Sequence, residues 1–308
     1  MKTLICLFVT GTLLMSAHRA LCHDGRGGLT LEPQVSTRGL SMGETGLVGT
    51  GDAESFAVNP SCLPLAATLQ AGLAHGNLID GVASSATCFS IAFPFGTSEG
   101  NPGSNAIRHK YGLGFSFDHK GFDLAQGSRW SCQTVSLGFG YMFSQYASAG
   151  IVSKTLFSSS DLDAVGVKAY GIDVGTRLEL SPRIDLGLVI RNLVGGATWD
   201  GGENEAVPMV VNLGGTVMIP YDMSAELALV VAGSGGSKLG LGLDVPVMET
   251  GFHLRGGYAY RAGDYSRSLL TAGFGFRHQR YRLAYAVRVG DENAFGLTHH
   301  FSLSGELR

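Results

Sequence analysis

The sequence predicts an all-β protein: a transmembrane antiparallel β-barrel of the outer-membrane type, with about 14 strands and an N-terminal hatch in its lumen. Three observations support this prediction. Apolar residues alternate with glycine and polar residues along most of the chain, and turn signals divide the alternating part into short segments. The first 22 residues have the pattern of an export signal.

Composition narrows the class of protein further. The 308 residues include 46 glycines, 15% are charged and 44% are hydrophobic. A chain this hydrophobic is not expected to be disordered. The net charge of -3 gives nucleic acid no general electrostatic attraction to the protein. We therefore expect a folded, glycine-rich protein without a nucleic-acid partner.

The first element is the expected signal peptide, residues 1–22. Lys2 supplies its positive start, an apolar stretch of about a dozen residues follows, and Ala20-Leu21-Cys22 offers a cleavage site. A buried N-terminal element and lipidation of Cys22 remain open alternatives. Beyond this segment, glycine or a charged residue interrupts every long apolar run, which excludes a helical membrane protein.

The second element, residues 23–66, does not alternate and is expected to be a separate hatch. A segment of this kind cannot face lipid, because its backbone polar groups would have no partners there. It is most simply placed inside the lumen of a barrel formed by residues 67–308.

The barrel region alternates with the period of two that marks β-strands. In residues 171–180, for example, Ile172 and Val174 share an apolar face, while Asp173 and Gly175 share the opposite face. The expected strands are fourteen in number, at 67–75, 84–93, 107–118, 131–143, 145–157, 165–180, 183–192, 207–219, 222–232, 237–247, 249–261, 266–277, 280–289 and 294–306.

A soluble β-sandwich would show the same alternation, with its apolar face in the core. The other face decides between the two folds. Solvent-facing strand positions favour Thr, Lys, Glu and Arg, and glycine weakens a strand interior. Here glycine recurs on that face, together with single charges of both signs. The small side chains on this face are explained if the face lines a lumen that is filled by a plug, and this favours the barrel.

Three stretches of the sequence carry a resemblance to a known family. The first runs from Arg38-Gly39-Leu40-Ser41-Met42-Gly43 through Asp52-Ala53 to Asn59-Pro60 and Leu63. It is similar to the N-terminal signature of the FadL/TodX-type outer-membrane transporter superfamily and of the related PorV group. Ser61-Cys62 stands here in place of the usual Ala-Gly.

The other two stretches lie in the barrel region. Ile172-Asp173-Val174-Gly175 and the later Arg191-Asn192-Leu193 resemble the middle of the same group, and residues 296–304 resemble its final strand, with His300 in place of the usual Arg. The three stretches occur in the family's order. Their form is most similar to the compact spirochaete FadL-like branch.

This resemblance implies a hatch-gated barrel for the passive uptake of hydrophobic molecules, typically long-chain fatty acids. By the motif match, the expected hatch and gating residues are Asp52, Asn59, Pro60 and Leu63. The PorV-like members imply instead a structural or accessory barrel that assists the secretion or display of other proteins. A soluble secreted β protein is the third alternative.

Charged residues on the expected inner face are candidates to bind a carboxylate headgroup. The alternative is a paired network that holds the hatch. The candidates are Asp173, Arg177, Arg191, Arg255 and Arg277. No catalytic constellation, metal-ligand cluster or cofactor motif stands out, so we expect no enzyme activity, no metal site and no cofactor.

Three cysteines follow the expected signal peptide, Cys62, Cys88 and Cys132, and their pairing stays open. The expected location is the bacterial outer membrane. The expected partners are a hydrophobic small molecule or fatty acid, outer-membrane lipid and, during biogenesis, the barrel-assembly machinery.

Overall fold

The structure is a computed structural model, and it describes residues 36–49, 51–77, 84–97, 109–123, 129–160, 166–233, 236–262, 267–290 and 296–307. The expected signal peptide and the first part of the expected hatch, up to residue 35, lie outside the described residues. Within these ranges, no helix has the length and apolar content needed to cross a bilayer.

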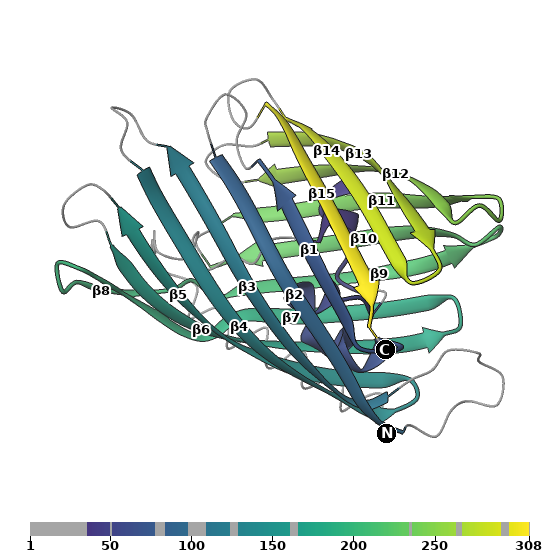
Figure 1. Cartoon of the computed structure of the whole chain (residues 1–308), viewed down its shortest axis with the longest axis horizontal. Coiled ribbons are helices and arrows are strands. Elements are labelled where there is room, and N and C mark those ends of the chain that lie inside the picture. Colours follow the sequence, from purple (N-terminus) through teal and green to yellow (C-terminus); the bar gives the residue numbers. More distant parts are fainter. Residues whose placement is uncertain are drawn as a thin grey trace.

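The described chain begins with short helices and continues as strands (Figure 1). The helices are α3 (Thr37–Ser41), α4 (Ser55–Val58) and the 3-10 helix η1 (Pro60–Leu65). The strands are β1 (Gln70–Gly76), β2 (Ser84–Thr97), β3 (His109–Asp123), β4 (Arg129–Ser144), β5 (Ala147–Ser160), β6 (Val167–Ser181), β7 (Ile184–Trp199), β8 (Asn204–Ala206), β9 (Val210–Ile219), β10 (Met223–Ala232), β11 (Ser237–Val247), β12 (Phe252–Ala262), β13 (Arg267–His278), β14 (Tyr281–Gly290) and β15 (Leu297–Glu306).

The strands close into one antiparallel barrel. Apart from β8 and β9, each strand pairs with its neighbours in the chain, and β1 also pairs with β15, where Leu73 lies opposite Leu303. Between β6 and β10 the wall passes through β7 and β9. Fourteen strands therefore form the wall, as the sequence predicts, and β8 adds only three residues to the far end of β7.

The predicted end of the seventh strand, residue 192, is wrong. Strand β7 continues to Trp199 through an irregularity in its pairing with β6, where the register shifts between Ile172 and Val174. Asn192 has a positive φ of 52°, and the next two residues, Leu193 and Val194, are both exposed. The bulge breaks the alternation, so the sequence pattern ends there although the strand does not.

The outer face of the barrel is apolar. Leu137 and Leu270 are 61% and 62% exposed, and most other outward positions carry large hydrophobic side chains. Outward aromatic rings stack across β2, β3 and β4, with ring centroids of Phe95 and Tyr111 5.2 Å apart and those of Tyr111 and Tyr141 5.5 Å apart. An apolar band with aromatic residues is the surface of a barrel in lipid.

The two ends of the barrel differ in their connections. Residues 145–146, 182–183, 220–222, 248–251 and 279–280 make short turns at one end, which we call the short-turn end. The β2–β3 connection, residues 98–108, is the long exception at this end. Most connections at the opposite, long-loop end are longer. In outer-membrane barrels, short turns face the periplasm and long loops face outward.

Residues 36–66, which we call the hatch, lie inside the barrel (Figure 1, purple). Glycines on the inner face let the hatch backbone approach the wall. A side chain at Gly150 would meet the carbonyl of Pro60 at 2.5 Å, and one at Gly112 would meet Leu63 at 2.6 Å. On the opposite wall, a side chain at Gly257 would collide with the backbone nitrogen of Gly43. The glycine-rich face predicted from the sequence is therefore the face that contacts the hatch.

Replacing Gly257 with Ala should loosen the hatch without dissolving the barrel. The added methyl group has no space beside Gly43, and overpacking of this kind costs about 1–3 kcal/mol. We expect faster hydrogen–deuterium exchange in peptides from residues 36–66 and unchanged heat-modifiable gel migration. Gly256→Ala is the matched control, because a side chain there meets only the Thr271 carbonyl at 3.9 Å. Equal exchange in the two variants would contradict the close-approach argument.

Candidate functional site

Asn59 connects the two halves of the hatch and joins them to the wall. Its side chain is fully buried, and its Oδ1 accepts hydrogen bonds from the backbone N and the Oγ of Ser61 at 3.1 and 2.7 Å. Its Nδ2 donates to the carbonyl of Leu47 at 3.0 Å and to that of Thr176, on β6, at 3.2 Å. Pro60 follows as the first residue of η1, where its fixed φ suits a helix start.

The other two residues of the hatch motif have structural contacts as well. Asp52 Oδ1 accepts from the backbone N and Oγ of Ser55 at 2.8 and 2.6 Å at the start of α4, and its Oδ2 lies 3.9 Å from Arg282 of the wall. Leu63 is buried in a cluster with Phe56 and other apolar residues. The structure brings the four predicted hatch residues together inside the lumen, while their part in gating stays a prediction.

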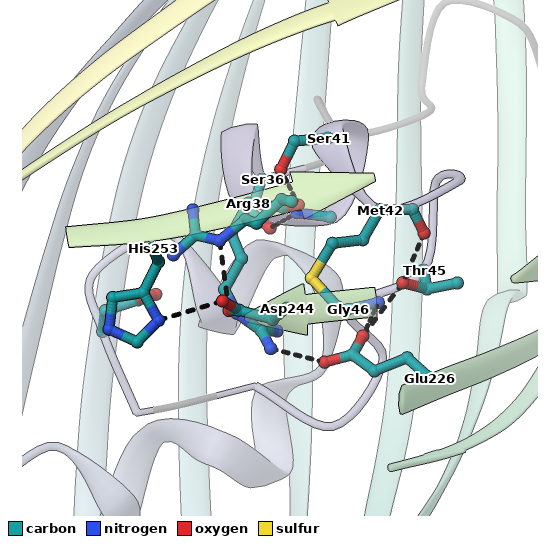
Figure 2. A network of polar contacts seen from close by, with 12 residues as sticks. Ser36, Arg38, Ser41, Met42, Thr45, Gly46, Glu226, Asp244 and His253 are labelled. Atoms are coloured by element: carbon teal, nitrogen blue, oxygen red, sulfur yellow. Dashed lines mark hydrogen bonds and ion pairs between the residues drawn. The ribbon is translucent and has the colours of Figure 1, made fainter. Parts of the chain in front are cut away.

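Arg38 anchors the hatch on the short-turn side of the lumen. Figure 2 shows its contacts with the wall. Its Nη2 lies 2.6 Å from Oε1 of Glu226, on β10, and its Nε lies 3.4 Å from Oδ2 of Asp244, on β11. Glu226 Oε2 also accepts from Thr45 Oγ1 at 2.9 Å and from the backbone N of Gly46 at 2.8 Å. A single buried carboxylate of the wall thus holds two turns of the hatch.

Asp244 extends this network along the wall. Its Oδ1 is 2.9 Å from His253 Nδ1 (Figure 2). Its Oδ2 accepts from Arg255 Nε at 3.1 Å. The predicted candidate Arg255 therefore lies in the lumen, but its contact there is a protein carboxylate.

Glu44 anchors the hatch on the long-loop side. Its carboxylate receives three cations of the wall: Lys238 Nζ at 3.1 Å, Arg261 Nη2 at 2.7 Å and Arg288 Nη1 at 2.9 Å. The Glu44 side chain is 1% exposed. Burial alone would raise its pKa, but the three cations hold the pKa of Glu44 well below its usual range. Glu44 is therefore an ionised carboxylate within a cationic site.

Glu54 is the carboxyl group of the hatch with the opposite behaviour. Its Oε2 accepts from the backbone N of Thr37 at 2.9 Å, which ties α4 to α3. Burial and the nearby Asp52 carboxylate raise the pKa of Glu54 to about 7. Part of the hatch population therefore carries a neutral carboxyl here near neutral pH.

The remaining predicted lumen charges fall into three classes. Asp173 is paired: its Oδ2 is 2.8 Å from Lys154 Nζ, and its Oδ1 accepts from the backbone N of Asn192 at 2.8 Å. Arg177 is paired with Asp185 at 2.6 Å. These two residues belong to the paired network that the sequence analysis kept as the alternative.

Arg277 lies at the rim of the lumen, where it lines a cavity on the short-turn side. Its side chain is 58% exposed, 3.5 Å from Glu306, because it lies one position from the end of β13. Arg191 lies deeper in the lumen. Its Nε is buried without a hydrogen-bond partner, and it makes no ion pair with another described residue.

Two cavities lie on opposite sides of the hatch. A cavity of about 520 Å³ is on the short-turn side, and its lining includes charged residues of both signs, among them Arg38, Asp185 and Asp222. A cavity of about 80 Å³ lies beside Glu44. Its lining combines the cations Arg191, Lys238 and Arg261 with the apolar side chains of Leu47, Val58, Val210 and Val230.

The long-loop half of the lumen also has an apolar wall, which we call the apolar patch. It consists of Cys132, Leu156, Val167, Ala169, Ala197 and Val207, with Trp130 and Trp199 packed against it. Outward neighbours such as Phe157 and Tyr170 are exposed, so the patch residues point to the inside of the barrel. The lumen is therefore apolar and cationic toward the long loops and charged with both signs toward the short turns.

Several of these functional groups escaped the sequence analysis. Arg38 and Glu44 lie within the motif stretch that it quoted, but a motif does not show that their partners come from strands about 180–240 residues away. Glu226 and Lys238 interrupt apolar alternation as single charges, and this signal could have marked them as inward-facing.

The three cysteines are buried and make no disulfide among the described residues. Burial raises the pKa of the Cys62 thiol to about 11. The residues that the structure describes contain no cluster of three or more His, Cys, Asp or Glu side chains suited to a metal ion.

Glu54→Gln should make hatch stability less dependent on pH. The native pKa of about 7 lies above the ordinary value of 4.5, so the stability due to the neutral carboxyl is complete below pH 4.5 and is lost as pH rises through 7. An amide cannot ionise, and it should therefore protect the hatch by roughly 3 kcal/mol above pH 7, with the gain shrinking toward pH 4.5.

Hydrogen exchange of hatch peptides between pH 5 and 8 measures this difference. Glu249→Gln, in an exposed turn, is the control and should follow the wild type at every pH. A gain from Glu54→Gln that is the same at all pH values would contradict the assignment.

Comparison with known proteins places the fold. No family profile matches the chain, and no curated protein matches its sequence. The solved structure of the monoaromatic hydrocarbon channel CymD matches with a TM-score of 0.68 at 12% identity, over 89% of this chain and 98% of the channel.

Two further solved structures agree. The Pseudomonas putida toluene transporter TodX gives a TM-score of 0.65 at 12% identity, over 90% of this chain and 99% of the transporter. A Pseudomonas aeruginosa FadL homologue gives 0.64 at 12% identity, over 88% and 98%. Identities this low show shared architecture only: the chain has the 14-strand barrel fold of FadL- and TodX-type channels.

Proposed function

We propose that the protein is a channel of the bacterial outer membrane through which hydrophobic molecules enter by passive diffusion past the hatch. The observation that carries the proposal is the apolar patch, which lies in the lumen at the long-loop end. An outer-membrane lumen is ordinarily polar. These apolar side chains pack against one another inside the barrel with two tryptophans beside them, and we propose that a hydrophobic compound leaves water by entering between them.

The likeness in fold supports the same proposal. The solved structures named above are described as a monoaromatic hydrocarbon channel and a toluene transporter. For this chain we propose long-chain fatty acids as the ligand class, because a cationic cavity with Arg191 and Lys238 lies near the apolar patch. Val210 of the cavity lining is three residues from Val207 of the patch in the sequence.

The proposed gate is the segment around Asn59 and Pro60. The short-turn side of the hatch opens on the 520 Å³ cavity, and Asn59 connects the segment to Leu47 on one side and to β6 on the other. Displacement of this segment would join the apolar patch to that cavity and so to the periplasm. The likeness to the PorV group and to the spirochaete branch remains a prediction from the motifs.

Uptake of a fluorescent fatty acid into proteoliposomes tests the proposal. The wild-type protein should accelerate uptake over empty vesicles, and Asn59→Ala and Pro60→Ala should cut it several-fold, because the segment then no longer moves as one unit. Heat-modifiable migration should show that both variants keep the folded barrel. Exposed Met248→Ala, in a turn, is the control.

Two results would contradict the proposal. Unchanged uptake in both hatch variants would contradict the gating role of the segment around Asn59 and Pro60. No uptake by the wild type, together with stoichiometric capture of a secreted protein, would favour the accessory barrel.

A further inference from the structure

We infer that Lys238, Arg261 and Arg288 form an anion-binding site that the hatch fills with its own carboxylate, Glu44, and that the carboxylate of an amphipathic ligand exchanges with Glu44 to release this side of the hatch. The inference rests on the proposed function, since it assumes that such ligands enter the lumen. It adds the residues that hold this side of the hatch and the ligand group, a carboxylate, that would displace Glu44.

The geometry around Glu44 is that of a built anion site. Three cations from three strands, β11, β12 and β14, converge on one carboxylate at 2.7–3.1 Å. Arg261 contacts both carboxylate oxygens through its Nη2, at 3.0 and 2.7 Å. Arg288 is itself oriented by a hydrogen bond from its Nε to Thr298 Oγ1 at 3.0 Å. Charge-assisted contacts of this kind recognise any carboxylate that reaches them.

The two partners belong to different parts of the molecule, because the cations lie on the wall and Glu44 lies on the hatch. Glu44 has a positive φ of 59°, a backbone conformation that side-chain-bearing residues adopt at an energetic cost. Gly43 and Gly46 on either side also have positive φ. The three cations therefore hold Glu44 in a strained backbone conformation, together with the contacts of Thr45 and Gly46 to Glu226.

An unfilled space next to Glu44 provides the entry point. The 80 Å³ cavity has the volume of a carboxyl group and a few carbons, since a water molecule takes about 30 Å³. Arg191 lines it with a buried Nε that has no hydrogen-bond partner. Leu47 and Val58 line it as well, and both belong to an apolar cluster that includes Val189 of the wall. A headgroup can therefore meet a cation first and the Glu44 site second.

Matched probes separate a carboxylate effect from a general loosening. Decanoate and 1-decanol have the same chain and differ in the headgroup. Trp130 and Trp199, the two tryptophans of the sequence, pack against the apolar patch, so tryptophan fluorescence of the full chain in a neutral detergent reports binding of both probes.

Glu44→Gln should strengthen decanoate binding about tenfold or more, because the site loses its charged occupant, and it should change 1-decanol binding less than twofold. Arg191→Gln should weaken decanoate binding and spare 1-decanol. The control is Asp244→Asn, which removes a contact of Arg38 on the short-turn side of the hatch and should leave decanoate binding unchanged. Heat-modifiable migration confirms that each variant is folded.

Equal strengthening of both probes by Glu44→Gln would overturn the inference, since it would report a loosened hatch only. Binding of 1-decanol without any effect of Glu44→Gln or Arg191→Gln on decanoate would also overturn it, while the proposed channel would stand. Absence of binding of either probe to every variant would instead count against the proposed function itself.

Discussion

Close approach between backbone and backbone is the constraint on which the rest of this structure depends. The hatch fits in the lumen because the wall beside it lacks side chains at Gly112, Gly150 and Gly257. Glycine costs a strand stability through its conformational freedom. That cost is offset by contacts with Phe56 and Leu63, and the result is a barrel whose interior shape is matched to one particular segment.

Charge then determines how the hatch is held within that shape. Arg38 binds wall carboxylates toward the short turns, and Glu44 binds wall cations toward the long loops. Buried ion pairs add little net stability compared with apolar packing, but breaking one partner of a pair is costly. Ion pairs of this kind hold the hatch in one place, and a competing ion of the same sign can replace either partner.

Much of the fold could be predicted from the sequence, and the site only in part. The alternation in segments such as 171–180 shows which residues share the lipid-facing side, because successive side chains of any strand point to opposite faces. The end of β7 could not be predicted because of the bulge at Asn192. The positive φ of Asn192 and the shift in register depend on a contact with Asp173, which lies on another strand. The partners of Glu44 and Arg38 follow from barrel closure, which no local pattern encodes.

The seam between β1 and β15 has a consequence for the order of assembly. It joins the two ends of the barrel sequence, and the backbone N of Leu307 donates to the carbonyl of Leu69, directly after the hatch. A pairing between such distant segments forms late, because its loop-closure entropy is the largest. Until this pairing forms, the sheet is open along one side, and the hatch can enter through that opening. We therefore expect insertion of the hatch and pairing of β15 with β1 to be coupled steps of folding.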